Sequence, residues 1–378
     1  MTKLSWPIRE YEGGENMEGY KPGVSVAAGR YMAKWSDLDI HFKSSMLNIQ
    51  PGDDLNVFIN FESILRNLTL QSRLITNLVQ YKQQIVIELE SAILNLVAHY
   101  RLLFVKKMKC NTKIYYYYTD LTAEEPQEMT CVNKYYRSYY RNRYLQNPEF
   151  REMGKVLTDI IIPEVELILS YVPNVYFLKS KTFDSSIIPQ VISSMSGAKN
   201  VIVTGDVFDT LYLFNPDFLT LYIKNRYSYF RICSNIDSTV QTIIKNESPF
   251  DLGIFKSEMY FRLLLSVRGS KVRNIKASKG FGYTTFLRII KNGIDRDIVL
   301  KDFESLDSII QLFPEEIRAD LKKAFQCLSI ETQYDMMSEA DKSSLKDQII
   351  DRVDFMSLQA LNNKRFYDFP VNISALLG

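Results

Sequence analysis

Histidine, tryptophan and cysteine are scarce in this chain of 378 residues, which holds 2 His, 2 Trp and 4 Cys. With only His41 and His99 present, chemistry that depends on a histidine metal site or a histidine triad is improbable. The cysteines are far apart and form no C-x-x-C pair: Cys110, Cys131, Cys233 and Cys327. This spacing argues against a zinc site and a disulfide scaffold, and it fits a reducing compartment.

Long apolar runs are also missing, and the first residues do not read as a signal peptide, so we expect no membrane association. The formal net charge is only +2, which neither demands nor excludes nucleic acid as a partner. Hydrophobic residues make up 46% and charged residues 24% of the chain, as in globular proteins. The length suffices for two ordinary domains, or for one large domain with additions.

Tyrosine and phenylalanine are abundant, at 24 and 22 residues, and they help to mark the expected strands. Apolar and β-branched stretches predict strands that alternate with amphipathic helical segments. The strands are expected at residues 55–60, 113–120, 175–178, 200–206, 219–223 and 229–232. This alternation predicts an α/β fold with a mostly parallel sheet flanked by helices, followed by a helical region from residue 255 onward.

Polar residues follow three of these strands at their carboxyl ends: Asn60, Asp120 and Asp206. In open parallel sheets the functional sites form where the strands end. The three residues are therefore expected to share one rim, and a catalytic site would lie there.

Residues 263–293 predict the end of one helix, a loop with Gly280 and Gly282, and a second helix from about Thr284 to Lys291. Two glycines ahead of a helix N-terminus let the backbone approach a phosphate, whose charge the helix dipole favours. The alternative is a tight helix–loop–helix turn without a ligand.

Cations and tyrosines interleave at residues 134–144, where Arg137, Arg141 and Arg143 lie at helical spacing. Guanidinium groups neutralise phosphates and aromatic rings stack on bases, so the segment could contact nucleic acid. The alternative is a solvated helix whose tyrosines pack inward while its arginines face out or pair with the acidic residues before them.

We expect three parts in the chain: an N-terminal extension at 1–50, an α/β core at 51–250 and a helical region at 251–378. The extension is rich in turn residues, and it is interpreted either as a tail packed on its own domain or as an arm docked on a partner.

Five blocks of the sequence, in order, resemble the 5′-nuclease family of flap endonucleases and phage 5′→3′ exonucleases. Residues 59–66 (INFESILR) are similar to the family's first acidic strand end followed by G-N-S-L-L-x-R. Asp120 and the segment 135–143 resemble its second acid and basic helix, and residues 183–186 (FDSS) its E-A-D-D. Residues 204–209 (TGDVFD) resemble [ST]-G-D-x-D, and residues 269–285 resemble the block G-D-x-x-D-N-I-P-G-x-x-G-I-G-x-K-T. The resemblance implies a PIN-like sheet and a helix–three-turn–helix element.

The departures from the family pattern concern the acids that hold two catalytic metal ions. The resemblance places carboxylates where this chain has Asn60, Asp120, Phe183, Ser185, Ser186, Asp206, Phe208, Ser270 and Arg273. Only Asp120 and Asp206 remain, as relic acidic positions, while Asp184 and Asp209 are displaced substitutes at best. Two carboxylates rarely hold a magnesium pair, and Arg273 puts a positive charge where a cation should bind. We therefore expect an inactive protein without a metal cofactor, and a packed rim around Phe183 and Phe208.

Three functional hypotheses follow. The first is a nuclease-fold protein without activity that serves as a structural component, most specifically of a phage virion (neck, tail or capsid-associated), with other virion or assembly proteins as partners. The second is a non-catalytic DNA-binding protein whose contacts form this set: Lys271, Arg273, Lys276, Lys279, Gly280, Gly282, Arg137, Arg141 and Arg143. The third is a weak metal-dependent nuclease. No small-molecule substrate is expected, and the location would be the virion or the host cytoplasm.

Overall fold

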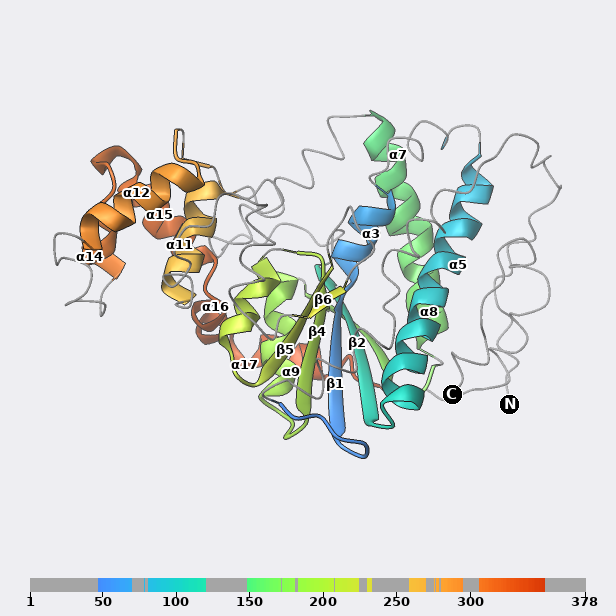
Figure 1. Ribbon diagram of the computed structural model, residues 1–378. Coiled ribbons are helices and arrows are strands. Elements are labelled where there is room, and N and C mark those ends of the chain that lie inside the picture. The colour runs from blue at the N-terminus through green and yellow to red at the C-terminus, as the bar shows by residue number, and fades with distance from the viewer. Residues whose placement is uncertain are drawn as a thin grey trace, which may run out of the picture.

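The computed structural model of this chain describes an α/β sheet and a set of helices attached to it (Figure 1). The described residues are 47–69, 78, 81–119, 148–170, 172–180, 183–206, 208–223, 230–232, 258–269, 275, 277–278, 280–294 and 306–350. The predicted N-terminal extension up to residue 46 and the cationic segment 134–144 lie outside these ranges.

The sheet has six strands in the order β3-β2-β1-β4-β5-β6. They are β1 (Asp54–Asn60), β2 (Asn111–Thr119), β3 (Val175–Ser180), β4 (Lys199–Thr204), β5 (Phe218–Ile223) and β6 (Phe230–Ile232). The first five run parallel, and β6 pairs antiparallel with β5. The expectation of a mostly parallel sheet flanked by helices is thus confirmed, and the strand order is consistent with a PIN-like fold.

Helices cover both faces of the sheet. On one face lie α3 (Phe61–Thr69), α5 (Lys82–Arg101), α7 (Pro148–Val156) and α8 (Ile162–Leu169), with short π-helical turns at Leu102–Lys107 and Leu157–Ile161. On the other face lie α9 (Ile188–Ser193), α16 (Ile330–Met336) and α17 (Glu339–Lys346). Among the helices described, none is long and apolar enough to cross a bilayer.

Strand β2 shows why both faces of the sheet are apolar. Its four consecutive tyrosines, Tyr115–Tyr118, are all buried. Side chains alternate along a strand, so Tyr116 and Tyr118 enter the core under α5 and α8, while Tyr115 and Tyr117 enter the core under α9. A central parallel strand is buried on both sides and therefore reads as one apolar run.

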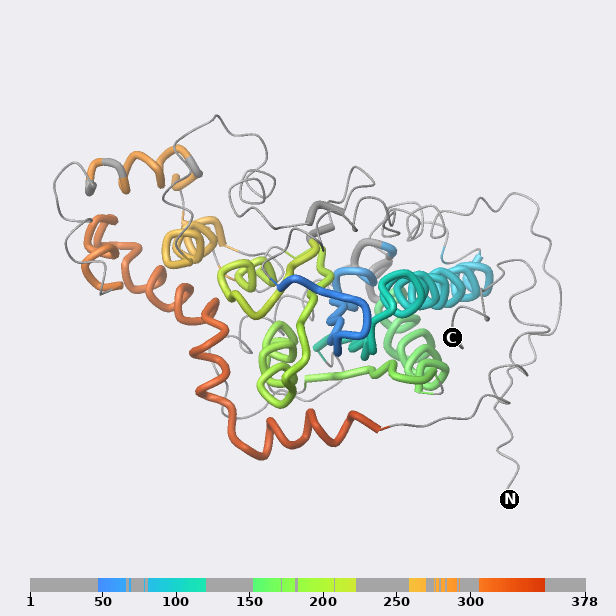
Figure 2. The backbone as a smooth tube through the Cα atoms, turned by 60° about the horizontal axis from the view of Figure 1, so that its bottom comes forward, coloured from blue at the N-terminus to red at the C-terminus, as the bar shows by residue number. Residues whose placement is uncertain are grey.

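A second hydrophobic core joins the helical region to the sheet. It contains α11 (Glu258–Arg268), α12 (Tyr283–Ile294), α14 (Leu306–Ile310) and α15 (Glu315–Cys327). Phe208 and Leu211, from the 3₁₀ turn η4 (Phe208–Phe214) that follows β4, belong to the same core. Beyond α15 the chain runs back through α16 and α17 to the sheet (Figure 2).

Two helices have starts that local side chains set. Between β3 and β4 the chain forms the 3₁₀ turn η3 (Ser185–Ile187) and then α9. Helix α17 begins at Glu339 because Ser338 and Asp341 form a capping box.

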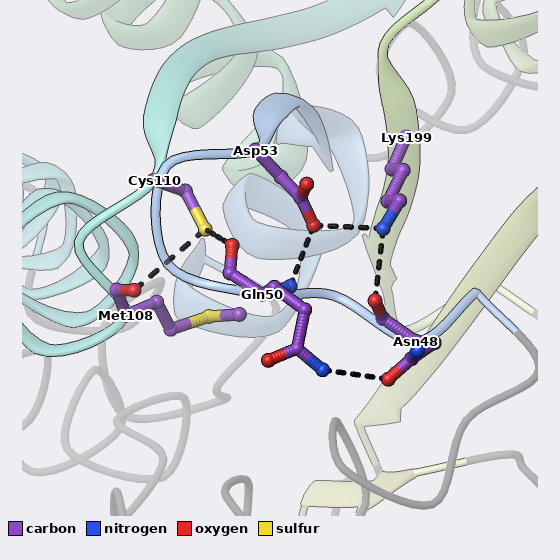
Figure 3. A network of polar contacts seen from close by, with 6 residues as sticks. All are labelled: Asn48, Gln50, Asp53, Met108, Cys110 and Lys199. Atoms are coloured by element: carbon purple, nitrogen blue, oxygen red, sulfur yellow. Dashed lines mark hydrogen bonds and ion pairs between the residues drawn. The ribbon is translucent and has the colours of Figure 1, made fainter.

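A polar network fixes the chain where it enters β1, at the end of the sheet opposite the rim (Figure 3). Lys199 Nζ of β4 lies 2.7 Å from Asp53 Oδ2 and donates to the Asn48 carbonyl at 2.8 Å. The Lys199 hydrogen bond lowers the pKa of Asp53, and the backbone N–H of Gln50 acts in the same direction. Burial raises the pKa of the Cys110 thiol, which donates to the Gln50 carbonyl. These contacts align the start of β1 with β4.

Arg262 of α11 is the main charged contact inside the helical core. Its guanidinium carbon lies 3.9 Å from the centre of the Phe325 ring of α15, and its Nη1 lies 3.2 Å from Glu258 Oε1. The Arg262 side chain is 16% exposed, so its contact with the Phe325 ring is screened little by water, whereas the Glu258 side chain is 37% exposed.

We expect Arg262→Met to lower the free energy of unfolding by about 2 kcal/mol, because it removes a desolvated cation–π contact and leaves Glu258 unpaired. Chemical denaturation measures the change. The matched control is Lys322→Met, which breaks the exposed pair with Asp307 and should cost less than about 0.5 kcal/mol. Equal losses in both variants would contradict this role of Arg262.

Candidate functional site

The carboxyl ends of β1, β2 and β4 form the rim that the sequence predicted. Asn60 ends β1, Thr119 ends β2 and Thr204 ends β4, and the register places β1 between the other two strands. Asp206 follows β4 and is 7% exposed. Asp120 itself lies outside the described residues, although its neighbour Thr119 is at the rim.

Asp209 is the centre of this rim, although the sequence offered it only as a displaced substitute. Its side chain is fully buried. Three donors converge on its Oδ2 atom: Asn60 Nδ2 at 2.5 Å, Tyr117 Oη at 2.9 Å and Thr204 Oγ1 at 2.7 Å. Hydrogen bonds to a charged acceptor are strong, and a buried carboxylate is tolerated only with such partners. Asp209 therefore connects the ends of β1, β2 and β4.

The tyrosines beside Asp209 are held in their protonated form. Burial raises the pKa of Tyr117 well above its usual value, and the Asp209 charge adds to the effect. The pKa of Tyr212 is likewise raised by burial and then by Asp209. The Tyr212 hydroxyl donates to the Ser186 carbonyl at 2.7 Å. Both phenols act as hydrogen-bond donors rather than as anionic ligands.

Glu62 supplies a second, half-buried acceptor, which sequence reasoning missed. One of its oxygens accepts from the backbone N–H of Thr119 at 2.5 Å and from Ser185 Oγ at 3.3 Å. The Ser185 N–H in turn donates to Thr119 Oγ1 at 3.1 Å. The available signal was an acid in the first turn of the helix that directly follows β1. Glu62 thus connects α3 with β2 and η3.

The other candidate acids shape local turns. Asp184 caps η3 by accepting from the Ser186 N–H at 2.9 Å. Asp206 accepts from the Phe208 N–H at 2.9 Å, and its own N–H donates to Thr204 Oγ1. Phe183 is 5% and Phe208 8% exposed, which confirms the expected packed rim. Within the described ranges, no three His, Cys, Asp or Glu side chains are grouped so that they could hold a metal ion.

The predicted phosphate loop is described only in part. Gly280 has a φ of +79°, which L side chains rarely adopt, and it is exposed, as is Gly282. A Cβ atom at either glycine would meet no atom within 4 Å, so the backbone there is open to solvent. Phe281, between them, packs on the second core. The loop leads directly into α12.

Seven of the nine predicted DNA contacts fall outside the described residues. They are the four cations around the glycine loop and the three arginines of the segment 134–144: Lys271, Arg273, Lys276, Lys279, Arg137, Arg141 and Arg143. Their positions stay predictions.

Comparisons with known proteins found likeness in solved structures alone. No family model matches the sequence, and no curated protein matches it. The chain is similar to the flap endonuclease of bacteriophage T5, D15 (D155K), solved as a pseudo-enzyme–product complex with DNA and metal ions. The TM-score is 0.47 at 10% identity, with 78% of this chain and 98% of that chain covered. It is also similar to the catalytic core of Rad2 in complex with DNA, with a TM-score of 0.32, 13% identity and coverage of 81% and 95%. The T5 protein is a flap endonuclease, the kind of protein that the sequence resembles.

We expect Asp209→Ala to destabilise the fold by more than about 3 kcal/mol, because it leaves three buried donors without their acceptor. Urea unfolding measures the loss. Asp217→Ala is the matched control: Asp217 lies in the next turn and is exposed, so its loss should stay within about 0.5 kcal/mol. Similar stability of the two variants would show that the Asp209 contacts contribute little.

The raised tyrosine pKa values predict alkaline instability. Above about pH 10 the unfolded chain loses phenolic protons that the folded chain keeps, so the free energy of unfolding falls as pH rises. The affected groups are Tyr116, Tyr117 and Tyr212. Each contributes a slope of about 1.4 kcal/mol per pH unit, up to its folded pKa.

In Tyr117→Phe the slope above pH 10 should therefore be shallower by about 1.4 kcal/mol per pH unit, although the variant is less stable at neutral pH. Unfolding by urea at pH values from about 7 to 11 measures both slopes. Between about pH 7 and 9 these phenols are protonated in both states, so the two slopes should coincide there. An unchanged alkaline slope would contradict a protonated, buried Tyr117.

Proposed function

We propose that this protein is a non-catalytic member of the nuclease-like fold class that acts by binding or by assembly. The observation that carries the proposal is the convergence of three hydrogen-bond donors on the buried carboxylate of Asp209. A two-metal nuclease needs carboxylate lone pairs that face cations and water. Here the lone pairs of Asp209 Oδ2 face an amide and two hydroxyl groups.

The electrostatics of the rim support the same proposal. Asn60 presents an amide N–H at the end of β1, where the resemblance places a carboxylate. Asp206 and Asp184 accept from backbone N–H groups in their own turns. Each of these hydrogen bonds uses lone pairs of one carboxylate oxygen and leaves fewer of them for a divalent cation. A structural role in a phage virion is the particular setting that the sequence resemblance favours, and it stays a prediction.

The test is cleavage of a 5′-flap DNA with Mg²⁺ or Mn²⁺, run on the wild type and on Asp206→Ala, with Asp217→Ala as the off-rim control. We expect the three proteins not to differ in metal-dependent cleavage of this DNA. In calorimetry, we expect the wild type to show no Mn²⁺ binding that is lost in Asp206→Ala. Cleavage by the wild type and by Asp217→Ala, but not by Asp206→Ala, would overturn the proposal and favour a weak nuclease.

A second candidate, binding of the DNA backbone, is favoured by the glycine loop. Gly280 and Gly282 expose main chain immediately ahead of α12, a helix of 12 residues. Free N–H groups at such a helix start, together with its dipole, favour phosphate. The proposed contacts also include the cations Lys271 and Arg273 that precede the loop in the sequence.

We expect Lys271→Glu with Arg273→Glu to weaken DNA binding and to reduce the slope of log affinity against log salt by about 2, one for each lost phosphate contact. Fluorescence anisotropy at several salt concentrations measures the slope. The charge-matched control is Lys322→Glu with Lys323→Glu on α15, which should lower the affinity less and keep the slope. Identical behaviour of the two double variants would reject the loop as a phosphate site.

A further inference from the structure

The amino ends of the parallel strands, at the bottom of the sheet in Figure 1, carry polar side chains in cross-strand rows. Asp54 of β1 is opposite Asn111 of β2, and Asn56 is opposite Lys113. Residues two apart in a strand share a face of the sheet. Lys113 is two residues before Tyr115, which enters the core under α9, so both rows lie on the α9 face.

These rows line a cavity of about 620 Å³. Another wall of the cavity is the loop 196–198 between α9 and β4, and Asn174 ahead of β3 also lines it. Small-molecule sites typically measure roughly 300–1,000 Å³. A Cβ atom at Gly197 would meet no atom within 4 Å, so the loop leaves space there. The cavity is at the end of the sheet opposite the Asp209 rim.

Asn56 is a fixed polar group in this lining, and it is only 2% exposed. Its Nδ2 donates to Ser196 Oγ at 2.7 Å and to Asn200 Oδ1 at 3.1 Å. Asn200 in turn donates to the Asp217 carbonyl at 3.2 Å. Both hydrogens of the Asn56 amide are thus used, while its Oδ1 accepts from no residue that the structure describes. The amide is held in one orientation and keeps an acceptor for a ligand.

The charges and amides of the lining limit the chemical class of the ligand. The charged side chains in the described lining are Asp54 and Lys113, one of each sign, so the cavity favours no net charge. Asn111, which donates to Asp54 Oδ1 at 3.2 Å, and Asn174 add amides that can both donate and accept. An apolar ligand would leave these groups without partners.

The aromatic row next to the cavity offers no platform for a planar base. Tyr115 lines the cavity and is 4% exposed. Its ring is stacked between Phe58 of β1 and Tyr176 of β3, with ring centroids 5.2 Å apart on each side. Because both faces of the ring are covered, a nucleobase could not stack on it.

We propose that this cavity binds a neutral, hydroxyl-rich ligand of the sugar class. Its partners are the Asn56 carbonyl oxygen, the amides of Asn111 and Asn174, and the Lys113 ammonium group. A sugar hydroxyl donates and accepts, so it can pair with all of these groups. The proposal assigns binding and no reaction. It goes beyond the proposed function, which concerns the opposite rim and the glycine loop, so either can fail without the other.

The test is a chemical-shift titration of the full chain by NMR with glucose, galactose, mannose and maltose, followed at the backbone amides of Lys113 and Ala198. Gly197→Tyr places a ring in the cavity. Met195→Tyr is the matched control, because Met195 is on the same loop, is 42% exposed and does not line the cavity. Asn174→Gly removes one amide without backbone strain, since Asn174 has a φ of +57° that glycine adopts readily.

We expect the wild type and Met195→Tyr to bind one of these sugars equally. Gly197→Tyr should bind it at least about tenfold more weakly, and Asn174→Gly about threefold more weakly. Unchanged amide shifts at the Asp209 rim show that each variant is folded.

Absence of binding by the wild type to all four sugars, at concentrations up to about 50 mM, would overturn the proposal. Equal binding by Gly197→Tyr and the wild type would also overturn it, because the sugar would then bind elsewhere. Tighter binding of glucuronate or glucosamine than of any neutral sugar would reject the neutral class of ligand.

Discussion

The carboxylate of Asp209 is the constraint on which the rim depends. A buried charge must be matched by donors, and these come from Asn60, Tyr117 and Thr204 on three neighbouring strands. The same 3₁₀ turn that places Asp209 under the rim also sends Phe208 and Leu211 into the helical core. One short turn therefore holds the strand ends in register and attaches the helical region to the sheet.

Neutral hydrogen-bond donors surround the carboxylates at this rim. Asp209 is bound by an amide and two hydroxyls, and Glu62 by a backbone N–H and a hydroxyl. A divalent ion would compete with these hydrogens for the same lone pairs, and it would release donors that are then buried without partners. A rim of this kind gains stability from the groups that a nuclease would use for chemistry. The proposal of a non-catalytic role rests on this use of the carboxylates as hydrogen-bond acceptors.

At the β3 edge of the sheet, the contacts involve backbone groups. A sheet leaves backbone groups of its outer strands without a strand partner, and β3 is one outer strand of the described sheet. Helices α15 to α17 carry the chain from the helical region back to β3, where Gln348 pairs with Lys179. The C-terminal part of the chain thus links the helical region to the far edge of the sheet.

The sequence by itself determined the strands, the parallel sheet, the glycine loop ahead of α12 and the apolar rim at Phe183 and Phe208. These follow from periodicity and from residue types, which act within a few residues along the chain. Only the tertiary structure decided that Asp209 is the centre of the rim and that Glu62 is part of it. Asn60 and Asp209 are 149 positions apart, and Glu62 and Ser185 are 123 apart. Partners at such separations are fixed by the strand order and register, which no local pattern contains. The start of α17 shows the opposite case, because its capping box at Ser338 and Asp341 is local and can be read from the sequence.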